Sequence, residues 1–137
     1  MLRLILHAGP ERLAVPAAAV AEVLPAVERH PLAGGPAWLS GAIRRSGAVV
    51  PVVDLCRLVG AGDCPVTLHA RIVVVGGATP FGLLTERVGD LREVADGSAM
   101  TAPVNDDGVN LGPLAADADG LVRLTNPAML LPPGVLP

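Results

Sequence analysis

Apolar residues recur in short runs along this chain, and most of these runs end at a glycine or a proline. At the amino terminus, residues 2–7 alternate between leucine and other side chains before the turn residues Gly9 and Pro10. Apolar residues resume over 13–15, after the charged pair Glu11 and Arg12. Runs of this length between turn residues are typical of strands, so we predict a hairpin with a polar tip.

Three further hairpins are predicted from pairs of apolar runs that flank short turns. They are Gly41–Arg45 with Ala48–Val53 around Ser46-Gly47, Arg71–Val75 with Pro80–Leu84 around Gly76-Gly77, and Val109–Leu114 with Leu121–Leu124 around Asp119-Gly120. A separate alternating strand is expected over Arg87–Val94. Because proline cannot donate to a strand ladder, Pro51 predicts an edge strand or a bulge at that point.

Three short helices are predicted between the strands. The first covers Ala17–Leu24, where apolar residues recur at helical spacing after Pro16. The second covers Leu55–Val59, with the side chain of Asp54 as its cap. The third begins after Asn126, with Pro127 at its first position, and ends at Leu131.

The chain is 137 residues long, which is the size of one domain. Many short strands at regular spacing with little helix favour an all-β fold, either β-barrels or a sandwich. Two similar halves, divided near the loop Gly60–Thr67, suggest two small barrels that share a core within a single domain 1–137.

Composition excludes several classes of function. All ten basic side chains are arginines, so lysine Schiff-base chemistry and the lysine of a phosphate-binding loop are absent. The formal net charge is −3, and Trp38 and Phe81 are the only aromatic residues. A nucleic-acid partner normally needs basic patches or aromatic platforms, so none is expected.

Cys56 and Cys64 stand eight residues apart, without a metal-binding spacing. We interpret them as a reduced pair, in preference to a disulfide or a metal site. The apolar amino-terminal stretch resembles a signal peptide, but His7, Glu11 and Arg12 interrupt it. With no apolar run long enough to span a membrane, the sequence predicts a cytoplasmic protein without direct membrane insertion.

No catalytic, cofactor-binding or metal-binding residues are predicted. His7, His30 and His69 are dispersed, and no serine lies in a nucleophile elbow. Asp117 and Asp119 resemble the start of a calcium loop, but a hairpin turn explains them better. Glu86 follows an apolar strand, and a surface ion pair with Arg87 or Arg92 is preferred to a catalytic role. A small hydrolase or metal enzyme stays open only if at least three His, Asp and Glu residues cluster in the fold.

The order of motifs resembles that of the CheW family of bacterial chemotaxis coupling proteins. The matching pieces are the alternating strand Leu2–His7, the charged hairpin Gly9–Arg12, the strand Leu13–Pro16, Val20-Ala-Glu22-Val23, Pro36-Ala-Trp38-Leu39-Ser40-Gly41, Pro51-Val-Val-Asp54-Leu55, Phe81–Val88, Asn110-Leu111-Gly112 and Leu121–Leu131. No single piece is decisive, but their order and spacing across about 130 residues are specific.

This resemblance implies a non-enzymatic adaptor without a cofactor. Its fold would be two intertwined five-stranded SH3-like β-barrels, and its partners the regulatory domain of a CheA-type histidine kinase and the tip of a methyl-accepting chemoreceptor. The receptor would bind in an apolar groove between the barrels, a recurrent mode of helix recognition. Val20 and Val23 would line one wall of that groove and Leu83 the other.

Two positions depart from the family pattern. The family usually has arginine immediately before the hairpin glycine, where this chain has Ser46, with Arg45 one position earlier. Alternation along a strand places Arg45 on the opposite face, so it does not replace the missing side chain unless the hairpin shifts register. Glu86 stands where the family has aspartate. The predicted partner-binding residues are Val20, Glu22, Val23, Ser46, Leu83 and Glu86. The alternative hypothesis is a divergent paralogue, a structural or competitive subunit of the signalling array that binds only one partner.

Overall fold

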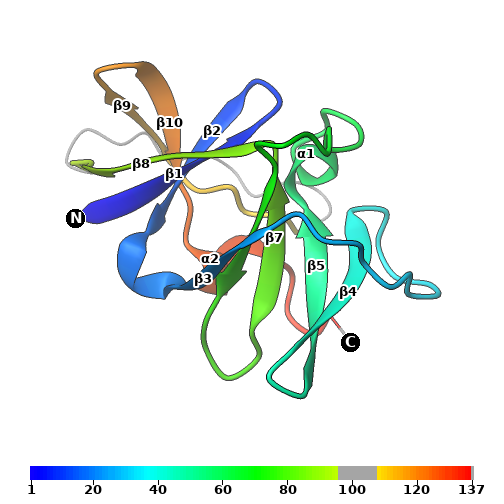
Figure 1. Cartoon of the computed structure of the whole chain (residues 1–137). Helices are drawn as coiled ribbons and strands as arrows, with labels where there is room; N and C mark the ends of the chain where they lie inside the picture. The colour runs from blue at the N-terminus through cyan, green and yellow to red at the C-terminus, as the bar shows by residue number, and fades with distance from the viewer. Residues whose placement is uncertain (96–107, 137) are drawn as a thin grey trace.

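The computed structural model describes residues 1–95 and 108–136, and within them it contains ten strands in two five-stranded sheets (Figure 1). Sheet A has the order β8-β1-β2-β10-β9, with bounds Arg87–Glu93, Leu2–Ala8, Glu11–Pro16, Gly120–Leu124 and Leu114–Asp117. Sheet B has the order β3-β6-β7-β5-β4, with bounds Val20–Pro25, Arg71–Val75, Phe81–Thr85, Ala48–Asp54 and Leu39–Arg45. The remaining elements are the 3-10 helix η1 (Ala17–Ala19) and the short helices α1 (Leu55–Leu58) and α2 (Pro127–Leu130). The predicted all-β class with short helices is confirmed.

The two sheets are interleaved along the chain. The chain leaves sheet A after β2, builds all of sheet B, and returns to sheet A at the β7–β8 connection. In Figure 1 the blue amino-terminal strands therefore lie beside the orange carboxyl-terminal strands, where β2 pairs in parallel with β10. The loop Gly60–Thr67 does not divide the two sheets as expected, because it connects α1 to β6 within sheet B. Strands from the two ends of the chain complete one sheet, which the order of elements in the sequence does not reveal.

The predicted helix Ala17–Leu24 is wrong beyond its first turn. Only Ala17–Ala19 is helical, as η1, and Val20–Pro25 is strand β3. β3 pairs antiparallel with β6, so its exposure alternates along the strand instead of following a helical period. The ladder to β6 outweighs the weak helical preference of a short alanine-rich segment.

The predicted Ser46-Gly47 turn and the two predicted helix caps are confirmed. Ser46 and Gly47 have φ of 51° and 79° and form the two-residue turn between Arg45 and Ala48. The Asp54 carboxylate accepts a hydrogen bond from the Arg57 N–H and caps α1. At α2, the Asn126 side chain accepts from the Ala128 N–H, with Pro127 at the start of the helix.

Pro51 lies in β5, which is an interior strand between β7 and β4, so the expected edge position is not observed. Pro51 faces Ala42, whose N–H and C=O both bond to His30, each at 2.8 Å. The Ala42–Pro51 pair is therefore of the type without hydrogen bonds between the two residues, and the missing N–H costs no bond to β4. The irregularity lies in β4 itself, between Leu39 and Gly41. The same His30–Ala42 bridge links the segment after β3 to the opposite edge strand.

The last hairpin is shorter than expected, since β9 begins at Leu114 and not at Val109. Before it, the Asn110 side chain accepts a hydrogen bond from the Gly112 N–H, and the Asn110 N–H bonds to Leu130. An Asx turn of this kind offers the backbone an alternative to a strand ladder. Gly112 has φ of 90°, which also departs from strand geometry.

The core is shared between the sheets. Alternation along β1 directs Leu4 and Leu6 into a large cluster that also holds Val52 and Leu83 of sheet B. Ile5 points to the other side, into a smaller cluster with neighbours from sheet A. β1 is thus buried on both faces, and it joins the two sheets into one folding unit. Among the described residues, no helix is long and apolar enough to cross a membrane.

Candidate functional site

Glu22 and Arg45 form an ion pair between the two edge strands of sheet B. Glu22 lies on β3 and Arg45 ends β4, and their side chains are 39% and 42% exposed. A second contact joins Arg45 Nε to Glu22 Oε2 at 3.3 Å. Arg45 is therefore held towards β3, while Ser46 occupies the exposed turn beyond it. The expectation that Arg45 does not stand in for an arginine at position 46 agrees with this geometry.

The predicted valines of β3 lie on opposite faces of their strand. Val23 is 44% exposed, whereas Val20 is partly buried and packs against the shared core. β3 is an edge strand of sheet B, so Val23 is accessible to another protein.

Leu83 does not line a groove, which corrects the prediction. It lies on β7 between β6 and β5, and none of its surface is exposed. A parallel ladder on one side and an antiparallel ladder on the other enclose β7, and all five of its residues are buried. The groove role of Leu83 was an implication of the family resemblance, whereas a strand buried on both faces is a continuous apolar run.

Ser46 and Glu86 lie at opposite ends of sheet B. β5 and β7 run parallel, with Asp54 opposite Leu84. Ser46 precedes the start of β5 and Glu86 follows the end of β7, so the sheet separates the two positions. Figure 1 shows this separation, with the β4–β5 turn at the foot of sheet B and α1 at its head. The structure therefore does not bring the six predicted residues together into one site.

Glu86 joins the two sheets instead of pairing on the surface. Its carboxylate accepts a hydrogen bond from the Gly9 N–H in the β1–β2 turn of sheet A, and its Oε1 lies 3.6 Å from the Cys56 sulfur of α1. The Glu86 N–H also donates to the His7 carbonyl at 3.1 Å. Arg92, one of its expected partners, bonds to aspartates of sheet A and the β9–β10 turn.

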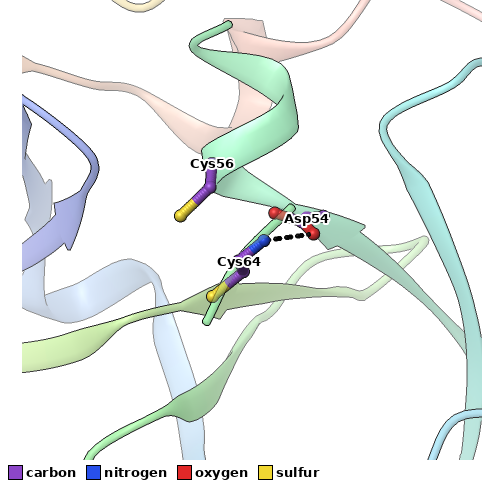
Figure 2. A group of neighbouring side chains, drawn as sticks. All are labelled: Asp54, Cys56 and Cys64. Carbon is purple, nitrogen blue, oxygen red and sulfur yellow. Dashed lines mark hydrogen bonds between the residues drawn. The ribbon is translucent and has the colours of Figure 1, made fainter. Parts of the chain in front are cut away.

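A cluster of two thiols and a carboxylate lies beside this junction, and the sequence analysis missed it. Asp54, Cys56 and Cys64 are all buried, and each offers a ligand atom within 4.8 Å of the other two (Figure 2). Asp54 Oδ1 accepts from the Arg57 N–H at 3.2 Å, and Oδ2 accepts from the Cys64 N–H at 3.0 Å. The available signal was Asp54-Leu-Cys56 followed by Gly60 and Gly62, two glycines of positive φ that turn the chain back.

Both cysteines are free thiols, as the predicted reduced pair requires. Burial raises the pKa of the Cys56 thiol, and the neighbouring Cys64, Glu86 and Asp54 raise it further. Burial also raises the pKa of Cys64, although a hydrogen bond with Cys56 opposes the rise. Neither thiol is therefore an activated nucleophile, since nucleophilic cysteines have lowered pKa values.

The histidines do not join this cluster. Within residues 1–95 and 108–136, the only group of three possible metal ligands is Asp54, Cys56 and Cys64. Burial lowers the pKa of His7, and the charges of Arg87 and Arg12 lower it further. The hypothesis of a hydrolase or metal enzyme required three clustered His, Asp and Glu residues, and this group contains one.

The aspartates that resembled a calcium loop form ion pairs instead. Asp117 bonds to Arg12 of β2 and to Arg92 of β8, and Asp119 bonds to Arg92. The Arg12 guanidinium lowers the pKa of Asp117 to about 2. The Asp119 N–H donates to Asp117 Oδ1, as in a hairpin turn, so the turn interpretation agrees with the structure.

A cavity of about 520 Å³ lies between the β6–β7 turn and the carboxyl-terminal segment. Its lining is mainly apolar and comes from η1, residues 76–79, Phe81, α2 and residues 131–136. None of the predicted groove residues contributes to it. A smaller cavity of about 210 Å³ lies between the end of β3 and β4, and it includes Arg45.

Comparison with known proteins agrees with this architecture. A family model for the CheW-like domain matches residues 3–131. Protein FrzA of Myxococcus xanthus is 32% identical over 100 residues, which cover 72% of this chain and 62% of that protein. Chemotaxis protein CheW of Rhizobium meliloti (strain 1021) is 30% identical over 96 residues, which cover 69% of this chain and 62% of that protein. The aligned part thus spans less than two thirds of each relative.

The fold is also similar to a solved structure, that of the scaffolding protein TtCheW from Thermoanaerobacter tengcongensis. The TM-score is 0.76 at 20% sequence identity, and the match covers 90% of this chain and 87% of the other. At this identity the similarity establishes the fold.

Proposed function

Because the chain belongs to the family of CheW-like domains, we propose that it is a non-catalytic adaptor that couples a chemoreceptor to a CheA-type histidine kinase. The observation that carries this proposal is the family match over residues 3–131, together with the two interleaved five-stranded sheets. The match to a chemotaxis protein named CheW supports the same assignment. Binding and not bond-making is then the activity to be tested.

The exposed apolar side chains support a role in protein binding. Val23 on edge strand β3 is 44% exposed, and Val27 just beyond it is 47% exposed. Val27 lines the same cavity as Arg45, whose guanidinium pairs with Glu22, so charge lies next to the apolar side chain of Val27. An apolar centre with a charged rim is the usual anatomy of a protein interface. We propose the receptor helix as the occupant of this surface, with the kinase domain on another part of the molecule.

The test is direct titration of the purified chain with the cognate kinase regulatory domain and with a receptor tip fragment. We expect both to bind, and no complex with either at about 50 μM would overturn the proposal. Val23→Arg should weaken receptor binding at least tenfold without unfolding the protein, since it changes an exposed edge residue. Leu121→Arg on β10, where the leucine is 66% exposed, is the matched control and should leave receptor binding unchanged.

The alternative is a subunit that binds only one partner, and it rests on Ser46. Arg45 is held by Glu22, so the tip of the β4–β5 hairpin presents a hydroxyl where the family has a guanidinium. Ser46→Arg should raise the affinity for the missing partner if the arginine was lost by divergence. If Ser46→Arg leaves the affinities for both partners unchanged, this alternative is contradicted. If the unaltered chain already binds both partners, the adaptor is favoured.

A further inference from the structure

Asp54, Cys56 and Cys64 bring a carboxylate and two thiols together in the interior, where these side chains have little contact with solvent. Their exposed fractions are 2%, 1% and 7%, and their ligand atoms lie within 4.8 Å of one another. Thiolate and carboxylate ligands suit Zn²⁺ and similar thiophilic ions. We infer that this cluster is a binding site for Zn²⁺ or a divalent ion of the same chemistry, with Glu86 as the fourth ligand.

Glu86 lies beside the cluster and supplies the fourth ligand after a side-chain movement. Its Oε1 is 3.6 Å from the Cys56 sulfur, but it is not among the ligand atoms that all lie within 4.8 Å of one another. Figure 2 shows that both sulfurs point to the same side, while the Asp54 carboxylate lies on the other side of the Cys64 backbone. Four ligands in total are the number that structural zinc sites require.

Binding of the ion requires the ligand atoms to adjust. Zinc–sulfur bonds of about 2.3 Å in tetrahedral geometry place two sulfurs roughly 3.8 Å apart, and the three ligand atoms of the cluster lie within 4.8 Å of one another. Cys64 follows the exposed loop of residues 60–63, in which Gly60 and Gly62 both have φ of 83°. Cys56 and Asp54 are fixed by α1 and its cap, so the loop carrying Cys64 supplies the adjustment.

Binding of the ion displaces protons from the site. The ion replaces the two thiol protons, which leave to the solvent, and the two thiolates neutralise its charge. The two carboxylates then leave the site with a charge of −2, and Arg57 Nε lies 3.4 Å from Asp54 Oδ2 to offset part of it. Each carboxylate oxygen has a second lone pair, so Asp54 can keep its bonds to the N–H groups of Arg57 and Cys64 while it binds the ion.

The site lies where the two sheets meet, so a bound ion would affect the stability of the fold. Glu86 also accepts a hydrogen bond from Gly9 of sheet A, whereas Asp54, Cys56 and Cys64 belong to the sheet B side of the junction. An ion held by all four would therefore tie the two sheets together at this point. We expect bound metal to stabilise the whole domain, because a ligand that binds only the folded state raises the apparent stability.

The test uses the full chain, reduced and kept free of oxygen, with Co²⁺ as a spectroscopic probe. We expect one Co²⁺ per chain, an ultraviolet sulfur-to-cobalt charge-transfer band, and displacement of Co²⁺ by Zn²⁺. Cys56→Ser and Cys64→Ser should each abolish the band, and Glu86→Gln should weaken binding about tenfold. Asp63→Asn is the matched control, because Asp63 is an exposed carboxylate adjacent to Cys64 that is not among the four ligands.

A second measurement on the unaltered chain does not depend on the folding of any variant. Zn²⁺ should slow alkylation of both cysteines and raise the melting temperature. The inference is overturned if reduced protein shows no charge-transfer band, or if Zn²⁺ leaves alkylation unchanged. It is also overturned if Asp63→Asn abolishes binding while the serine variants retain it, since exposed carboxylates would then hold the ion.

Discussion

The Arg12 guanidinium of β2 forms a bidentate ion pair with the Asp117 carboxylate of β9, with N–O distances of 2.9 and 2.8 Å. The two strands are not hydrogen-bonded to each other, since β10 lies between them in sheet A. The side chains therefore reach across β10, and Arg92 of β8 adds a third contact at 3.0 Å from Asp117. One carboxylate thus connects three strands of the sheet.

Asp117→Asn should make the protein less stable at neutral pH and remove part of its sensitivity to acid. The pKa of Asp117 is lowered to about 2 from 3.8, chiefly by its hydrogen bonds from Arg12. A carboxyl whose pKa is lower in the folded state stabilises the protein above its unfolded pKa, and the contribution disappears as pH falls from about 4 to about 2. After allowance for screening by solvent we expect a loss of about 1 kcal/mol at pH 7. Urea denaturation at pH 7 and pH 2.5 measures it.

The control for that variant is Asp119→Asn, which removes an exposed contact to Arg92 and should cost less. If the stability difference between Asp117→Asn and the unaltered chain is the same at both pH values, the ion pair is not the source of the effect.

Val52→Asp should be severely destabilising. Val52 lies on interior strand β5 with none of its surface exposed, so the substitution buries an unpaired charge in the shared core. The expected cost is several kcal/mol, a large part of the stability of a domain of this size. Val49→Asp is the matched control on the same strand, because Val49 is 73% exposed. Thermal unfolding of the two variants should differ widely, and equal melting temperatures would contradict the register of β5.

Thr85→Val should weaken the junction between the sheets. The buried Thr85 hydroxyl donates to the His7 carbonyl at 2.6 Å, and valine keeps the shape while it removes this bond. We expect a loss of about 1 kcal/mol, together with faster amide hydrogen exchange in the β1–β2 hairpin. Thr125→Val removes a comparable bond to Leu111, at 2.7 Å, and the Thr125 N–H donates to Ala14 of β2 and not to the His7 end of the hairpin. It should cost a similar amount without faster exchange around residues 7–9, and identical exchange profiles would show that Thr85 has no coupling role.

Gly112→Ala should destabilise the protein far more than Gly120→Ala. Both glycines have positive φ, so alanine is strained at each by about 1–2 kcal/mol. At Gly112 the added methyl would also collide with the carbonyl oxygen of Leu124, whereas nothing lies within 4 Å at Gly120. The difference between the two free energies of unfolding, measured in denaturant, isolates the collision. A difference near zero would mean that the segment before β9 moves away from β10 without cost.

The sequence by itself determined those features whose causes lie within a few residues. The Ser46-Gly47 turn follows from the φ values that a two-residue hairpin needs, and the caps at Asp54 and Asn126 follow from the reach of short polar side chains. The order of the motifs along the chain is also visible in the sequence, and it identified the family. These features depend on backbone geometry and side-chain type, so they do not require knowledge of distant neighbours.

Only the tertiary structure decided the features that depend on which distant segments meet. Residues 20–25 form a strand because they pair with β6, and Leu83 is buried because its side chain packs into the core shared by the two sheets. Cys56 and Cys64 lie beside Asp54 because α1 and a glycine-containing loop bring them together, and Glu86 reaches Cys56 from the crossover between the sheets. In each case the stabilising free energy comes from hydrogen bonds and packing between residues far apart in the chain. Local sequence patterns do not encode these contacts.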